Sequence, residues 1–179
     1  MSLSARSVIA FWTDIGPERW FVADPDLDAL LRANHLALHE AAARGDLPWA
    51  DEPEGALALL LLLDQFPRNM FRGAARAFAT DSRALALAGR SIARGFDRAH
   101  PHVLRQFFYL PFMHAEDLAQ QRRSEALYTA HGDANALRYA VIHREIIERF
   151  GRFPHRNSAL GRITTPAEQA FLDAGGWAG

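Results

Sequence analysis

Two similar polar motifs stand out in the sequence, QFPRNMFRG and, about half a chain later, RFPHRNSALG. Each places an arginine directly before an asparagine, as Arg68-Asn69 and as Arg156-Asn157. Guanidinium groups bind carboxylates and phosphates through two parallel hydrogen bonds, and the neighbouring amide adds adaptable donors. Two such pairs brought together by the fold would hold an anionic group. Alternatively, the arginines satisfy carbonyl groups at helix ends and the asparagines form turns.

Two histidines interrupt helical stripes of apolar residues, where a leucine would serve packing better. They are His143, in the segment 133–150, and His114, in the segment that follows Pro101. A buried imidazole needs partners for its ring nitrogens, so each histidine is either a satisfied core residue or a functional base. The carboxylates that the sequence offers as partners are Asp64, Glu116 and Asp117.

Asp64 ends a leucine stripe four residues before Arg68, so a local ion pair is expected if helical geometry persists. The alternative is that Asp64 orients Arg68 or His114 for a ligand. His35 and His39 have the spacing of metal ligands on a helix, but no third ligand can be identified. We therefore interpret these two histidines as polar residues on the surface of a helix, and we predict neither a metal site nor a cofactor.

Composition excludes several kinds of chemistry. The chain has 179 residues and a formal charge of −1, so no net basic field favours nucleic acid or an anionic membrane. Lysine and cysteine are absent, which removes Schiff bases, thiolates and disulfides. The longest apolar run, Ala56 to Leu63, is far shorter than the roughly 20 residues that span a bilayer. We expect a soluble protein of the cytoplasm.

Alanine and leucine dominate whereas valine and threonine are scarce, which indicates an all-α protein. We expect one domain, residues 1–179, of about seven or eight helices joined by short connections into stacked antiparallel hairpins. Proline, glycine and capping residues predict helices over about 3–12, 25–44, 53–66, 81–94, 101–131, 133–150 and 166–173, with Pro111 dividing the fifth. Phe66 and Phe153 precede prolines and should mark where helical geometry stops.

Three segments, LLLDQFPRNMFRG, FFYLPFMHAEDLAQQRRS and HREIIERFGRFPHRN, resemble a widespread family of mainly bacterial proteins, domain-of-unknown-function family 924. The similarity covers nearly the whole chain. It implies an all-helical fold similar to tetratricopeptide repeats, but no reaction, because the family's activity is not established. The family's signature positions match Asp64 to Asn69, Pro111, Phe112, His114, Glu116, Asp117, His143, Arg144, Phe153, Pro154, Arg156 and Asn157.

We expect a groove that binds a small anionic molecule or peptide through a carboxylate or phosphate. The predicted binding residues are Arg68, Asn69, His114, Glu116, Asp117, His143, Arg144, Arg156 and Asn157, supported by Asp64. An alternative is an enzyme in which His114 or His143 is a general base oriented by Glu116 or Asp117, while the arginines stabilise negative charge. A third possibility is a structural network of buried polar groups that fixes how the helices pack.

Overall fold

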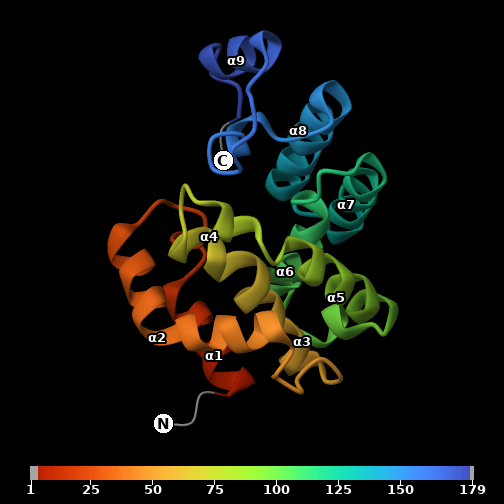
Figure 1. Ribbon diagram of the computed structural model, residues 1–179. Coiled ribbons are helices and arrows are strands. Elements are labelled where there is room, and N and C mark those ends of the chain that lie inside the picture. The colour runs from red at the N-terminus through yellow and green to blue at the C-terminus, as the bar shows by residue number, and fades with distance from the viewer. Residues whose placement is uncertain (1–3, 178–179) are drawn as a thin grey trace. The chain divides into compact units, whose positions relative to one another are not determined.

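The computed structural model describes residues 4–177 of the chain, and all regular elements among them are helical (Figure 1). The all-α prediction is therefore confirmed. The elements are α1 (Ala5–Ile15), α2 (Pro25–Arg44), α3 (Pro53–Leu60), a π-helical segment η1 (Leu61–Gln65), α4 (Phe66–Met70), η2 (Ala75–Phe78), α5 (Asp81–Ala93), η3 (Phe96–Ala99), α6 (His102–Met113), α7 (Leu118–His131), α8 (Ala134–Phe150), η4 (Pro154–Arg156) and α9 (Pro166–Asp173).

The described residues form two compact units. The first unit comprises residues 4–72 and 76–111, and the second comprises residues 73–75 and 112–177. The single domain and the stacking of successive hairpins stay predictions.

Local capping chemistry sets most helix boundaries as the sequence predicts. The Asp24 carboxylate accepts hydrogen bonds from the N–H groups of Asp26 and Leu27 at the start of α2, at 3.1 and 3.0 Å. Gly45 ends the same helix in the left-handed region, with a φ of 89°. Thr165 and Glu168 form the expected capping box of α9. The first helix begins at Ala5 and extends to Ile15, three residues past its expected end, and its predicted start at residue 3 lies outside the described residues.

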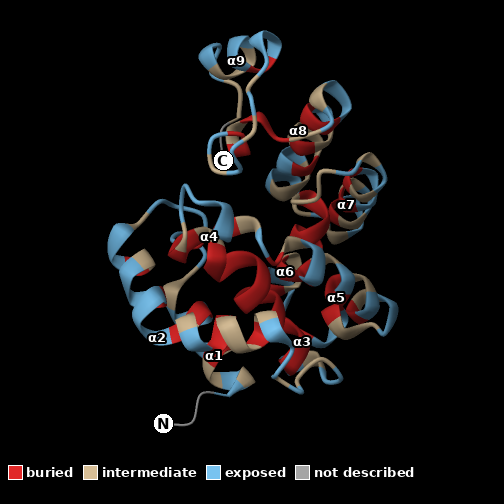
Figure 2. Cartoon of the chain, viewed as in Figure 1, coloured by how far each residue is buried: buried red, intermediate tan, exposed pale blue. Residues whose placement is uncertain are grey.

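The core of the first unit combines aromatic rings with the leucine run. Trp12 and Trp20 stack with ring centroids 6.1 Å apart, and the indole N–H of Trp20 donates to the Trp12 carbonyl at 2.7 Å. Every residue from Ala56 to Leu63 is buried, and Figure 2 colours the part of this run that lies in α3 accordingly. Burial of this short apolar run explains its composition without a membrane, and no described helix is both long and apolar enough to cross a bilayer.

Gly55 in α3 allows a close approach that no other residue would tolerate. A Cβ atom at this position would lie 2.0 Å from the carbonyl oxygen of Trp49, whereas a Cβ at Gly89 in α5 would meet nothing within 4 Å. We predict that Gly55→Ala lowers the free energy of unfolding by about 1–3 kcal/mol through overpacking. Gly89→Ala should raise it by about 0.5–1 kcal/mol, because alanine favours helices. Urea unfolding of both variants checks the prediction, and changes of the same sign would contradict it.

The expected helix end at Phe66 is wrong. Phe66 keeps helical angles (φ −59°, ψ −37°), because the preceding turn widens into the π-helical segment η1. The N–H of Phe66 therefore donates to the carbonyl of Leu61, five residues earlier. Widening frees the Leu62 carbonyl, which accepts from Nδ1 of His39 at 2.8 Å. Because Pro67 has no N–H, it cannot donate to the Leu63 carbonyl, which accepts instead from the Thr80 hydroxyl at 2.5 Å. The helical run therefore crosses the proline without losing buried hydrogen bonds.

The structure also differs from the prediction at Pro111. Helix α6 runs through Pro111 and ends at Met113, and α7 starts after Asp117. Because Pro111 lies so close to the end of α6, its missing N–H removes one donor from the last turn only. The helix therefore ends two residues after the proline and not at it. At Phe153, by contrast, the backbone is extended (φ −89°, ψ 111°), which confirms the predicted end there.

The second unit is built around a hairpin of α7 and α8, which Gly132 and Asp133 join. Gly132 ends α7 with a φ of 84°, and the Asp133 carboxylate caps α8 by accepting from the N–H groups of Asn135 and Ala136. The apolar face of α8 packs in a cluster whose buried members are Ile146, Ile147 and Phe153, with Leu118, Ile142, Phe150, Phe171 and Trp177 around them. This cluster holds the second polar motif against α8.

Candidate functional site

Arg68 of the first motif lies between two carboxylates. Its guanidinium is 3.4 Å from Asp64 and 3.2 Å from Asp81, and it also donates to the Ala77 carbonyl at 3.2 Å. Burial acts to lower the pKa of Arg68, but the two carboxylates outweigh it, so the pKa lies above its ordinary value. The Asp64–Arg68 ion pair was predicted, whereas Asp81 joins it from the start of α5.

The rest of the first motif binds α2. The Asn69 amide donates to one carboxylate oxygen of Asp28 at 2.9 Å, and Arg72 donates to both oxygens at 2.9 and 3.0 Å. Arg32 of α2 donates in return to the Met70 carbonyl at the end of α4. In the first unit the motif therefore ties the short helix α4 to α2 and α5.

The second motif makes a different set of contacts in the second unit. Arg156 is 6% exposed, lies with its guanidinium carbon 4.6 Å from the centre of the Phe153 ring, and donates to the His114 carbonyl at 3.0 Å. The Asn157 amide lies 3.4 Å from the Glu168 carboxylate, which accepts two hydrogen bonds from Arg152 at 2.6 and 2.9 Å. The Arg152 hydrogen bond lowers the pKa of Glu168 well below its usual range.

The two carboxylates proposed to orient a histidine have other partners. Glu116 accepts from the Phe153 N–H at 2.8 Å and from both terminal nitrogens of Arg162 at 2.7 and 3.0 Å. Burial acts to raise the pKa of Glu116, but these hydrogen bonds outweigh it and hold the pKa below its ordinary value. Asp117 caps α7 by accepting from the Gln120 N–H at 2.9 Å. Arg162 was not predicted, because no spacing rule links it to Glu116.

His143 lies among aromatic rings at 3% exposure. Its Nδ1 donates to the Tyr139 carbonyl of its own helix at 2.7 Å, so Nε2 is the basic nitrogen of the ring. The ring centroid lies 4.0 Å from that of Trp177, and Trp177 also contacts His155 at 4.8 Å. Burial is the main cause that lowers the pKa of His143 to about 3; nearby His114, His155 and Arg156 act in the same direction, and the Tyr139 hydrogen bond opposes them.

His155 and Trp177 were missed in the sequence. The signal for His155 was its position as the residue that distinguishes the second motif from the first. Trp177 lies far along the chain from His143, and nothing in its local sequence points to the contact. Arg144, which was predicted to bind a ligand, donates instead to Glu125 of α7 at 2.6 Å and also pairs with Glu148 on its own helix.

The predicted residues therefore fall into two groups. Asp64, Arg68 and Asn69 lie in the first unit, while His114, Glu116, Asp117, His143, Arg144, Arg156 and Asn157 lie in the second. The single groove that combines both groups stays a prediction.

The histidines of α2 are not surface residues, which corrects their interpretation from the sequence. His35 and His39 are each 3% exposed. The His35 ring packs between Phe11 and Phe66, with ring centroids 4.5 and 5.1 Å away. Nδ1 of His39 donates a hydrogen bond to the Leu62 carbonyl. Across residues 4–177, no group of three or more histidine, aspartate or glutamate side chains is placed to hold a metal ion.

Comparison with known proteins places this arrangement in a family. The family model described as "Bacterial protein of unknown function (DUF924)" matches residues 8–176. The chain belongs to this family. It is also similar to the solved structure of a protein of unknown function from Agrobacterium tumefaciens, with 47% identity over 95% of this chain and 97% of that chain and a TM-score of 0.91. No curated protein matches the DUF924 chain.

Proposed function

We propose that this DUF924 protein is a binding module that holds a small anionic group in its second unit, beside His114, His143, His155 and Arg156. The observation that carries the proposal is the grouping of basic side chains around two aromatic rings: Trp177 contacts the rings of His143 and His155, and Phe153 contacts His143 and Arg156. Besides burial, the groups that lower the pKa of His143 are two other imidazoles and a guanidinium. A bound carboxylate or phosphate would reverse the sign of that field.

The contacts of these residues favour binding over catalysis. A pKa of about 3 makes His143 a weak base at neutral pH, so it would gain a proton only when a negative charge lies beside Nε2. Trp177 and Phe153 supply apolar walls around the ring. The Glu116 carboxylate accepts two hydrogen bonds from Arg162 and also interacts with Arg156, so it lies near the basic side chains without taking all of their charge.

The test compares the binding of three small anions, which carry either a phosphate or a carboxylate group. Calorimetric titration of the full chain with inorganic phosphate, acetate and a short peptide with an unblocked carboxyl terminus should detect binding of at least one of them. Repeating the titration in two buffers of different ionisation enthalpy should reveal proton uptake, because the anion raises the pKa of a nearby imidazole.

His155→Gln is the informative variant, because His155 is half-buried at the edge of the cluster. It should weaken binding about tenfold, which corresponds to about 1.4 kcal/mol. Arg122→Gln is the matched control, because its side chain on α7 is 66% exposed. If no anion binds, or if both variants weaken binding equally, the proposal is wrong. A lower melting temperature of His155→Gln without any ligand effect would indicate a structural network.

A further inference from the structure

The first unit contains a hollow of about 520 Å³ between the end of α2, the following loop, α3, η1 and α5. This volume lies within the range of small-molecule sites, about 300–1,000 Å³. Its floor is formed by Leu59, Leu63 and Leu87, which are at most 5% exposed. Leu47 and Ala50, which are half-buried, also line the hollow, so a ligand seated there would cover their apolar surface.

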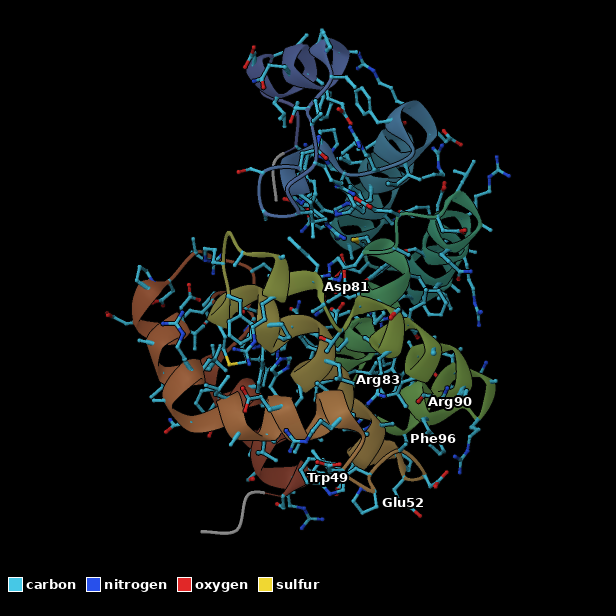
Figure 3. All side chains as sticks on the ribbon, viewed as in Figure 1. Trp49, Glu52, Asp81, Arg83, Arg90 and Phe96 are labelled. Atoms are coloured by element: carbon cyan, nitrogen blue, oxygen red, sulfur yellow. The ribbon has the colours of Figure 1, made fainter. Side chains whose placement is uncertain are left out.

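One wall of the hollow is basic. Arg83 and Arg90 both line it from α5, where a separation of seven residues places them two turns apart on one side of the helix. Figure 3 labels both arginines on this helix. The described residues that line the hollow include no acidic side chain. An anion would therefore meet two cations without a competing carboxylate in the wall.

The local backbone holds one of these arginines in place. Arg83 donates to the carbonyls of Ala42 and Ala43 at the end of α2, at 3.3 and 2.6 Å, so its guanidinium is ordered before any ligand arrives.

We propose that this hollow binds an amphipathic carboxylate, with its alkyl tail on the apolar lining and its carboxylate at Arg90 and Arg83. The geometry combines an apolar floor with a cationic edge, which suits a short fatty acid better than a free phosphate or a neutral lipid. This site is distinct from the anion site proposed for the second unit, because every residue in it belongs to the first unit.

The experiment is a calorimetric titration of the full chain with hexanoate, heptanoate and octanoate, and with octanol. Each added methylene group should raise the affinity about fourfold, the equivalent of about 0.8 kcal/mol. Octanol should bind at least tenfold more weakly than octanoate, because it brings no charge to the arginines. No binding at millimolar octanoate, an affinity independent of chain length, or equal binding of octanol would each overturn the proposal.

Variants of single residues test whether octanoate binds in this hollow. Arg90→Gln should weaken octanoate binding about tenfold, and Ala86→Phe should abolish it by filling the hollow from an exposed position. Arg98→Gln, an exposed arginine outside the hollow, is the control and should leave the affinity unchanged. Equal losses in Arg90→Gln and Arg98→Gln would show non-specific charge attraction and overturn the proposal.

Discussion

Arg68→Ala is expected to lower the free energy of unfolding by about 3–5 kcal/mol, the usual cost of removing one partner from a buried ion pair. The Asp64 carboxylate is 1% exposed and would lose the cation that lies 3.4 Å away. Asp81 and the Ala77 carbonyl would lose the same donor. Since domains are stable by only about 5–15 kcal/mol, urea unfolding should show a midpoint far below that of the wild type.

The matched control is Arg72→Ala, in the same motif. The Arg72 side chain is 48% exposed and pairs with Asp28, so its removal should cost only about 0.2–1 kcal/mol. Comparable losses in the two variants would contradict the assignment of Arg68 as a buried structural cation. A loss below about 1 kcal/mol for Arg68→Ala would contradict it as well, and would make Arg68 available for a ligand.

The contacts of the two motifs also explain why the chain contains both. Arg68 binds carboxylates from η1 and α5, whereas Arg156 binds the carbonyl of His114 and packs on Phe153. In the first unit the motif fastens the short helix α4 to α2 and α5, and in the second it fastens η4 and the next residue to the His114 carbonyl and to α9. The motifs resemble each other because both combine an aromatic anchor, a proline and polar donors, although the donors find different acceptors.

Features that depend on neighbouring residues could be predicted from the sequence. Asp24 caps α2, Gly45 ends it, and Thr165 and Glu168 form a capping box, because each of these interactions spans only a few residues. The same holds for the ion pair of Asp64 with Arg68, which lies one helical turn along.

Features that depend on distant residues could not be predicted. The π-helical segment before Phe66 is stabilised by side chains from elsewhere, since His39 and Thr80 satisfy the carbonyls that it leaves. The same holds for two residues of the candidate site. Glu116 meets Arg162, and His143 meets the Tyr139 carbonyl and Trp177. Residue type identified polar groups that need partners, but only the fold decides which partners they find.

His143 should make the protein less stable in mild acid. Its pKa is about 3 in the folded protein, against an ordinary value of 6.5, so below pH 6.5 the unfolded chain binds a proton that the native protein excludes. The stability that this neutral histidine confers is fully present above pH 6.5 and is lost as the pH falls toward 3. Each pH unit in that window costs about 1.4 kcal/mol, so lowering the pH from 7.5 to 5 should remove about 2 kcal/mol.

The measurement is urea unfolding of the wild type and of His143→Phe at pH 7.5 and pH 5. The variant has no titrating ring at this position, so its loss between the two pH values should be smaller by about 2 kcal/mol. Burial also lowers the pKa values of His35 and His39, and these histidines contribute with the same sign to both proteins. Their contribution therefore cancels in the comparison. An equal loss in wild type and variant would mean that an acidic partner reaches His143 and keeps its imidazolium stable, which would remove the charge environment on which anion binding depends.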